Sequence, residues 1–308
     1  MVRIVDCVIG LNETDMLEIR SAELSGAVDS IIVVESMKTH RGEANAPKFL
    51  DLAESMRAVG VDIVDYIIDD MPIVTENKTE VYWILENFHR NCIIRPLAKM
   101  GLDDGDIILI SDIDEIPRGE YVRQLPDMLD GAEVVVFEQI MKKFFVNNAS
   151  ATCANNLSWR GTVACRYGRL KAVTPQGARL GDPFRQRAGC VGGVGEAREH
   201  ERIIADAGWH FSSMGGASSF EIKHAAIVEG PGGSRFGTFD GRFGRHNHAA
   251  QRERYAEIYS AFLHDFAPDI IEVDVSDRAS VQGLDLPECI KADPLKYEHL
   301  FYFKNPID

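Results

Sequence analysis

Apolar and polar residues alternate with two different periods in the first third of the chain. Short runs rich in Ile and Val, the pattern of strands buried on both faces, occupy residues 2–9, 30–36, 61–68 and 106–111. Segments with helical spacing lie between them, at residues 14–24, 49–59 and 79–100. This alternation predicts a parallel sheet covered by helices, in which ligands bind beyond the carboxyl ends of the strands.

The pattern changes after residue 131. Apolar segments with no clean helix between most of them follow at residues 132–139, 142–148, 163–170 and 207–213. They predict mixed or antiparallel strands, and we expect this half to shape an acceptor pocket. Two glycine-rich stretches, residues 189–195 and 229–245, are either binding loops or plain surface loops.

The rest of the chain returns to helix and then to an aromatic tail. Residues 246–266 have a helical pattern, and residues 286–303 are expected to pack aromatic side chains onto the body. We therefore predict one α/β domain over residues 1–308, with a Rossmann-like half at 1–130 and a mixed-strand half at 131–308.

Composition narrows the choice of ligand. The 308 residues carry a formal net charge of −15, which disfavours nucleic-acid binding because phosphate backbones are held by basic surfaces. An anionic substrate would need a few placed Arg or Lys side chains, or a bound divalent cation.

No apolar run is long enough to span a membrane, and residues 1–10 do not form a signal peptide, so we expect a cytoplasmic protein.

The strongest chemical signal is the segment DIILISDIDEIP at residues 106–117. A buried strand ends in Ser111 and then presents Asp112 and Asp114, which share a face if the chain stays extended, while Ile113 packs inward. Carboxylate oxygens of this kind suit Mg²⁺ or Mn²⁺, with substrate phosphate oxygens completing the coordination. The alternative is an ordinary turn before Pro117, since Asp is common in turns.

Two other functional classes share this pattern. A DxD at a strand end also begins haloacid-dehalogenase phosphatases, in which Asp112 would be the nucleophile. The residues after the second Asp, Glu115 and Ile116, differ from the small segment usual there. A noncatalytic protein that binds a nucleotide sugar or a carbohydrate is the third possibility.

The chain also resembles glycosyltransferase family 17. The resemblance is carried by GLNETDMLEIRSAEL, VDSIIVVESMKTHRG, NFHRNCIIRPL, ILISDIDEIPR, WRGTVACRY, GWHFSSMGG and LPECI, which begin at residue 10 and end at residue 290. It implies a GT-A type fold and an inverting, metal-dependent transfer of N-acetylglucosamine from UDP-N-acetylglucosamine to a saccharide acceptor. Asp112 and Asp114 would hold Mn²⁺ or Mg²⁺ against the diphosphate, with His210 of the GWH segment as a third ligand.

Further residues are candidates for binding the donor. Asn12 and Glu13 follow the first strand and Glu35 ends the second, so all three reach the edge where the nucleotide is expected. Helix capping is the other interpretation for Asn12. Arg90, on the long helix, is a candidate partner for phosphate, with a solvated helix face as the alternative. Ser111 lies at the same edge, and Lys223 matches the family and would help to hold the diphosphate.

The acceptor side is less sharply defined by the sequence. Trp159 and Trp209 offer flat faces for a sugar ring or for core packing. The family has an acid shortly after GWH, but Ser218 occupies the matching position here. We therefore assign the catalytic base to Glu221, although Ser218 and Glu221 also form a capping box. Glu138 and Glu229 remain alternatives for the base.

Overall fold

The computed structural model describes residues 2–49, 61–73, 79–148, 158–180, 200–216 and 270–303, together with residues 219, 222, 223 and 226. The helix expected at residues 49–59 lies outside these ranges except for Phe49, as do the helix expected at residues 246–266 and both glycine-rich stretches. The strands are β1 (Ile4–Ile9), β2 (Ser30–Ser36), β3 (Asp62–Ile68), β4 (Ile107–Asp112), β5 (Glu115–Pro117), β6 (Val134–Phe137), β7 (Gln139–Lys143), β8 (Ser158–Trp159), β9 (Val163–Arg166), β10 (Glu201–Ile204) and β11 (Gly208–Ser212). The helices are α1 (Thr14–Leu24), α3 (Thr79–Asn91), α4 (Ile94–Leu97), α5 (Gly119–Val122), α6 (Leu125–Met128), α7 (Tyr167–Val173), α8 (Pro175–Leu180), α11 (Arg278–Gln282), α12 (Glu288–Ala292) and the 3₁₀ helix η3 (Glu298–Leu300).

A mostly parallel sheet forms the centre of the molecule. Within the described residues it has seven strands in the order β10-β6-β9-β4-β1-β2-β3. Strands β1, β2, β3 and β4 are mutually parallel, and β9 runs antiparallel between β4 and β6. The order reverses beside β1, so the carboxyl ends of β1 and β4 lie at a topological switch point, where open α/β sheets bind ligands.

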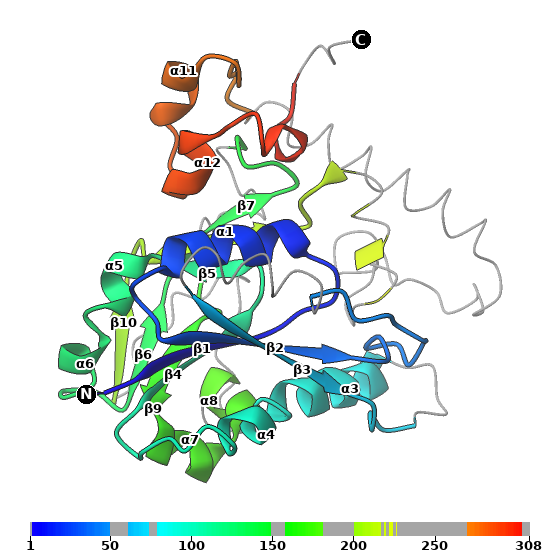
Figure 1. Ribbon diagram of the computed structural model, residues 1–308, viewed down its shortest axis with the longest axis vertical. Coiled ribbons are helices and arrows are strands. Elements are labelled where there is room, and N and C mark those ends of the chain that lie inside the picture. The colour runs from blue at the N-terminus through cyan, green and yellow to red at the C-terminus, as the bar shows by residue number, and fades with distance from the viewer. Residues whose placement is uncertain are drawn as a thin grey trace.

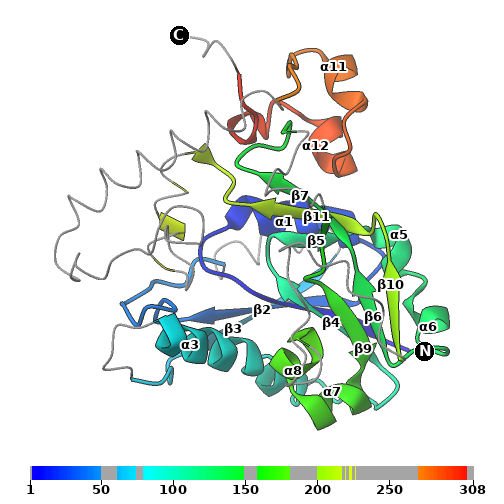
Figure 2. The ribbon, with the colours of Figure 1, turned by 180° about the vertical axis from the view of Figure 1, so that it is seen from behind.

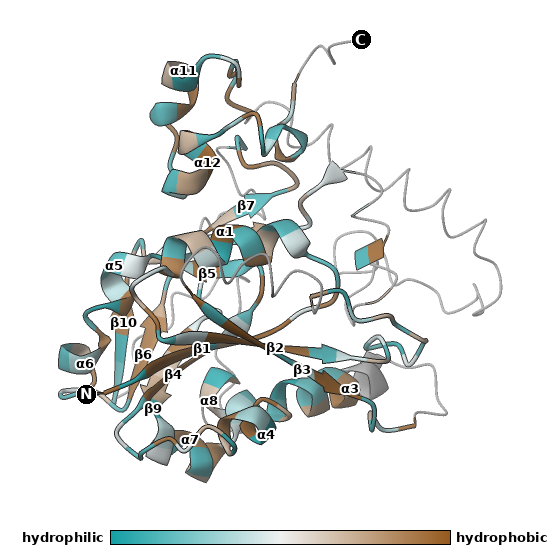
Figure 3. Ribbon diagram, in the orientation of Figure 1, coloured by the Kyte–Doolittle hydropathy of each residue, from teal (hydrophilic) through white to brown (hydrophobic). Residues whose placement is uncertain are grey.

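Helices cover both faces of this sheet. Figure 1 shows α3, α4, α7 and α8 on one face, and α1 on the other. Strands β1 and β4 are almost entirely buried and mostly apolar, and Figure 3 shows the central strands as the most hydrophobic part of the ribbon. Two-sided burial explains this composition, because each face must pack against a helix layer. The predicted α/β class is confirmed.

A second, smaller sheet lies on the α1 side, as seen from behind in Figure 2. Its order is β5-β11-β7-β8, with β11 antiparallel to β5 and parallel to β7. Both this sheet and β9 come largely from residues beyond 131, so the expected mixed and antiparallel additions are present.

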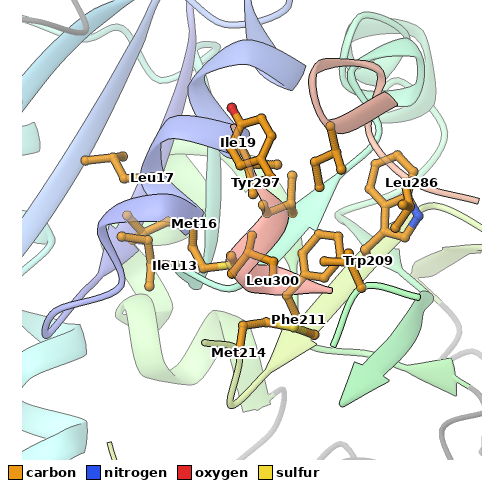
Figure 4. Close-up of a cluster of buried hydrophobic side chains, with 14 of the residues drawn as sticks. Met16, Leu17, Ile19, Ile113, Trp209, Phe211, Met214, Leu286, Tyr297 and Leu300 are labelled. Carbon is orange, nitrogen blue, oxygen red and sulfur yellow. The ribbon is translucent and has the colours of Figure 1, made fainter. Parts of the chain in front are cut away.

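The C-terminal segment completes the core between α1 and the small sheet. Figure 4 shows Met16 and Leu17 of α1 gathered with Trp209 and Phe211 of β11 and with Leu300 of η3. All five side chains are buried. The expectation that the aromatic tail packs onto the body is therefore confirmed.

Two local differences from the sequence pattern have clear causes. The single helix expected at residues 79–100 is divided into α3 and α4, because Pro96 has no N–H to donate to the carbonyl of Cys92. The N–H of Arg95 donates to that carbonyl instead, at 2.9 Å. In addition, helices α7 and α8 follow β9, where no clean helix was expected. Within the described residues, no helix is both long and apolar enough to cross a membrane.

Candidate active site

The DxD segment forms the turn between β4 and β5. Strand β4 ends at Asp112, residues 113 and 114 make a turn, and β5 begins at Glu115. Ile113 is 2% exposed and packs into the core, as expected. Asp114 thus lies in a turn rather than on an extended strand, so the turn interpretation is correct for the backbone. A turn is still compatible with metal binding, because both carboxylates remain at the carboxyl edge of the sheet.

Asp112 lies between two arginines. Its Oδ1 accepts from Arg90 Nη2 at 2.8 Å, and its Oδ2 accepts from Arg179 Nη2 at 2.8 Å. Burial raises the pKa of Asp112, but the charges of Arg179 and Arg90 outweigh burial and hold that pKa well below its usual range. Arg90 is itself buried and also contacts Glu86 and Gln176, so here it binds protein carboxylates rather than lying on a solvated helix face.

Glu115 is the buried centre of this arginine cluster. Both of its carboxylate oxygens accept from Arg179, at 2.5 and 2.6 Å. The backbone N–H of Asp112 donates to Glu115 at 2.9 Å, and the indole N–H of Trp159 donates at 2.5 Å. The side chain of Glu115 therefore fixes both the DxD turn and Trp159.

A third buried arginine, Arg20, supports the turn from the side of α1. Arg20 of α1 makes a bidentate pair with Asp6 of β1, with two contacts of 2.6 Å. It also donates to the carbonyl oxygen of Glu115 at 2.7 Å and to Ser111 Oγ at 2.6 Å. Ser111 is fully buried, so its expected contact with the donor is corrected to a structural contact with Arg20.

Asp114 faces a different set of partners. Its Oδ2 pairs with the ammonium group of Lys223, and its Oδ1 lies 3.7 Å from His210 Nε2. Burial raises the pKa of Asp114, whereas the neighbouring Lys223 and His210 lower it, and the net result is a pKa well below the usual range. Strand pairing sets this geometry, because the N–H of Phe211 donates to the carbonyl of Asp114 at 2.8 Å.

His210 is the histidine that the sequence singled out, and it reaches Asp114. Its residue neighbour across the strands is Glu115, and its ring lies 4.8 Å from the ring of Trp159, measured between centroids. His210 Nδ1 is buried and has no hydrogen-bond partner among the described residues. The imidazole is therefore held by packing and strand register, with Nε2 directed at the Asp114 carboxylate.

A pocket adjoins this group at the carboxyl end of β1. It is lined by Asn12, Glu13, Asp15, Met16, Phe211, Met214, Ser219, Lys223 and Leu300. Glu13 Oε1 lies 3.3 Å from Lys223 Nζ, and Glu13 Oε2 accepts the N–H groups of Leu11 and Asn12 at 3.1 Å. No side chain caps α1, so the capping interpretation of Asn12 does not apply.

These side chains fit a divalent cation that substrate oxygens would complete. No group of three His, Cys, Asp or Glu side chains in the described part of the chain is arranged as a metal site. Mg²⁺, however, is commonly held by one or two carboxylates together with substrate phosphates. Asp114 and Glu13 carry two negative charges against the single positive charge of Lys223, and His210 adds a nitrogen donor. Each oxygen of Asp112 can accept a second contact beyond its arginine.

Two predicted contacts take on structural roles. Glu35 is fully buried, and its oxygens accept the N–H groups of Lys48 at 2.7 Å and Phe49 at 3.0 Å, so it anchors residues 48–49 rather than facing a donor. Trp209 is 2% exposed, and Arg118 covers its ring at 4.2 Å. The sugar contact expected for Trp209 is corrected to a core role, as Figure 4 shows.

The acceptor side has one described aromatic candidate. Trp159 keeps part of its surface exposed, although its indole N–H is committed to Glu115. Of the acids considered for the base, Glu221 and Glu229 lie outside the described residues, as does Ser218. Glu138 is described, and it pairs with Arg160 at 2.7 Å.

Sequence reasoning missed Arg179 and the role of Arg20. Arg20 had a detectable signal: Asp6 is a single acid inside an apolar strand, and such an acid needs a buried cation. Arg179 had none, since it lies in an ordinary stretch 64 positions from Glu115 and reaches the site only after folding.

A model described as glycosyltransferase family 17 matches residues 1–175, more than half of the chain. The chain belongs to this family. It is therefore a glycosyltransferase, with the GT-A type sheet expected from its sequence, and it acts on a sugar donor and an acceptor. A search of curated proteins found no match for this family 17 sequence.

Solved structures give weaker likenesses to the family 17 chain. The Mycobacterium tuberculosis glucosyl-3-phosphoglycerate synthase is 17% identical, with 68% of this chain and 72% of that one covered and a TM-score of 0.35. Staphylococcus aureus TarS, residues 1–349, is 9% identical, with 97% and 83% covered and a TM-score of 0.38. A mycobacterial protein is 16% identical, with 72% of each chain covered and a TM-score of 0.37. Identities and scores this low add nothing to the family match.

Proposed function

We propose that this glycosyltransferase is metal-dependent and inverting, and that it transfers N-acetylglucosamine from UDP-N-acetylglucosamine to a saccharide acceptor. One observation carries the proposal. The Asp114 carboxylate lies 3.7 Å from His210 Nε2, beside the pocket lined by Asn12, Glu13 and Lys223. That pocket is at the carboxyl edge of a parallel sheet, where a nucleotide is expected.

Mn²⁺ or Mg²⁺ would be held by Asp114 and His210, with Asp112 beside them. When bound, the cation would neutralise charge that develops on the leaving diphosphate. Lys223, the half-buried partner of Asp114 and Glu13, would supply a second positive charge to the same oxygens. Asn12 and Glu13, which line the pocket, are proposed to contact the uridine or the ribose.

The acceptor hydroxyl must lose a proton during an inverting displacement, so a carboxylate base is required near the sugar. We keep Glu221 in this role, because it lies three residues after Ser218, the position at which the family has an acid. Trp159 is proposed to lie against the sugar, since its ring is held in place by Glu115 and His210. The phosphatase alternative is disfavoured, because the chain belongs to a family of glycosyltransferases.

The experiment is thermal-shift and calorimetric binding of UDP-N-acetylglucosamine, UDP-glucose, UDP-galactose and GDP-mannose, each with and without Mn²⁺. The wild type is compared with Asp114→Asn. We expect Mn²⁺-dependent stabilisation by UDP-N-acetylglucosamine, which is lost in the variant because the amide is a poor metal ligand. Asp130→Asn is the matched control, since Asp130 is an exposed acid paired with Arg166.

Three outcomes would contradict the proposal in different ways. Binding that is equal with and without Mn²⁺ would remove the metal, and preference for another donor would replace N-acetylglucosamine. No response to any nucleotide sugar would remove the nucleotide-sugar donor altogether. Stereochemistry is read separately, by NMR of the anomeric proton of the product formed on a saccharide acceptor.

A further inference from the structure

The buried arginine cluster holds the DxD turn from a helix that no sequence signal connects with it. Arg179 lies on α8, beyond residue 175, where the family match ends. Its guanidinium group spans two carboxylates: Nη2 donates to Asp112 Oδ2 at 2.8 Å, and both Nη atoms donate to Glu115. Nη1 also donates to the carbonyl oxygen of Gly161 at 2.9 Å.

The geometry of Asp112 depends on this contact in two ways. The carboxylate is bound directly by Arg179 on one oxygen and by Arg90 on the other. The backbone of Asp112 is held by Glu115, which Arg179 binds in a bidentate manner. Bidentate pairing fixes orientation as well as charge, which a lysine at the same place cannot do.

A second residue of α8, Gln176, also contributes to the surroundings of Asp112. Gln176, one turn before Arg179, accepts a hydrogen bond from Arg90, so α8 contacts both arginines that flank Asp112. The side chain of Arg179 is 9% exposed and that of Glu115 is not exposed at all, whereas that of Asp112 is 31% exposed. Arg179 thus lies behind Asp112, which alone of the three presents an appreciable surface toward a ligand.

We propose that Arg179 is a positioning residue for donor binding: it fixes Asp112, directly and through Glu115, in the orientation that receives the nucleotide diphosphate. Arg179 does not itself touch the donor. This inference rests on the proposed function, because it assumes that Asp112 faces a nucleotide sugar.

Arg179→Lys tests the fork geometry while keeping the positive charge. The readouts are the Kd for UDP with Mn²⁺, by calorimetry, and the unfolding temperature of the same preparation. We expect the Kd for UDP to rise by about 10- to 100-fold, the usual cost of disturbing a group that orients a ligand-binding side chain. Arg169→Lys is the matched control: Arg169 pairs with Glu133 on the surface and should leave the Kd unchanged.

A second variant separates positioning from simple neutralisation of Glu115. Arg179→Met/Glu115→Gln removes both buried charges, so the unfolding temperature should recover relative to Arg179→Met alone. If Arg179 positions Asp112, the Kd for UDP in this double variant stays raised above that of Glu115→Gln alone, although its stability returns. If Arg179 only neutralises Glu115, the Kd recovers together with the unfolding temperature, and the proposal is overturned.

The remaining outcomes are also decisive. A wild-type Kd in Arg179→Lys would overturn the positioning role while leaving the proposed function intact. Failure of the wild type to bind UDP with Mn²⁺ would remove the proposed function and this inference with it. Failure of both Arg179→Lys and Arg179→Met/Glu115→Gln to fold would assign Arg179 to the structure alone.

Discussion

Single side chains in this site are constrained by contacts that leave almost no spare volume. Gly161 lies against the Glu115 carboxylate and the Trp159 indole, and a Cβ at this position would overlap both groups. The absence of a side chain at residue 161 therefore permits the hydrogen bond between Trp159 and Glu115, and with it the approach of Arg179 to the carbonyl of residue 161.

Gly161→Ala is expected to be destabilising for this reason. Overpacking of a filled interior costs about 1–3 kcal/mol of unfolding free energy. We expect a loss of this size in urea unfolding, together with weaker UDP binding, because Glu115 must move away from the backbone of Asp112. Gly131→Ala is the control: no atom of the described residues lies within 4 Å of the added Cβ, so its stability should change little. Equal stability of the two variants would show that the Glu115 contact tolerates movement.

At the scale of elements, β2, β3 and residues 48–49 are joined by a pair of acids. Glu35 at the end of β2 accepts two backbone N–H groups, and Asp65 of β3 is close enough for its charge to act on Glu35. Burial, together with the charge of Asp65, raises the pKa of Glu35 to about 7. Glu35 therefore keeps its proton to a higher pH in the folded protein than in the unfolded chain.

The pair predicts a specific dependence of stability on pH. Between pH 5 and 7 the folded state holds a proton that the unfolded chain releases, so the free energy of unfolding falls as pH rises through this window. For one proton, the slope is at most about 1.4 kcal/mol per pH unit. Asp65→Asn removes the neighbouring carboxylate charge that raises the pKa of Glu35.

Urea unfolding at pH 5, 6 and 7 compares this variant with the wild type. We expect Asp65→Asn to gain stability relative to the wild type as pH rises. Asp69→Asn, at an exposed position, should follow the wild-type curve. Parallel curves for all three proteins would mean that Asp65 does not raise the pKa of Glu35.

At the scale of the whole molecule, the two ends of the chain build one core. Residues 270–303 cover α1 and the small sheet, and Leu300 lines the same pocket as Asn12. Asn147 fixes this segment, since its amide donates to the carbonyls of Ile271 at 2.9 Å and Tyr302 at 3.0 Å and accepts the N–H of Tyr302 at 2.9 Å. One side chain therefore ties both ends of the C-terminal segment to the body.

Asn147→Ala is expected to loosen the C-terminal segment. Three hydrogen bonds are lost at a residue that is 1% exposed, and unsatisfied buried groups cost about 1–3 kcal/mol each. Hydrogen exchange should rise at residues 270–303 before it rises in β1 or β4. Uniform protection across the chain would contradict this role. UDP binding should weaken as well, because Leu300 of this segment lines the pocket together with Met16 of α1.

The sequence by itself determined the strands β1 to β4, the helix after β1 and the position of the DxD acids. Each of these signals is local: a run of apolar residues, a helical period, or two carboxylates directly after a buried strand. The sequence also indicated His210 and Lys223, through segments that resemble the family, and both lie beside Asp114.

Tertiary structure alone decided which polar residues face the pocket and which support it. Ser111 and Glu35 have the right positions along their strands, yet burial commits them to Arg20 and to residues 48–49. Arg179 has no local signature, but α8 brings it to Glu115 and Asp112. The physical reason is that partnership of a buried charge depends on distances between elements far apart in the chain, and these distances are set by packing rather than by spacing in the sequence.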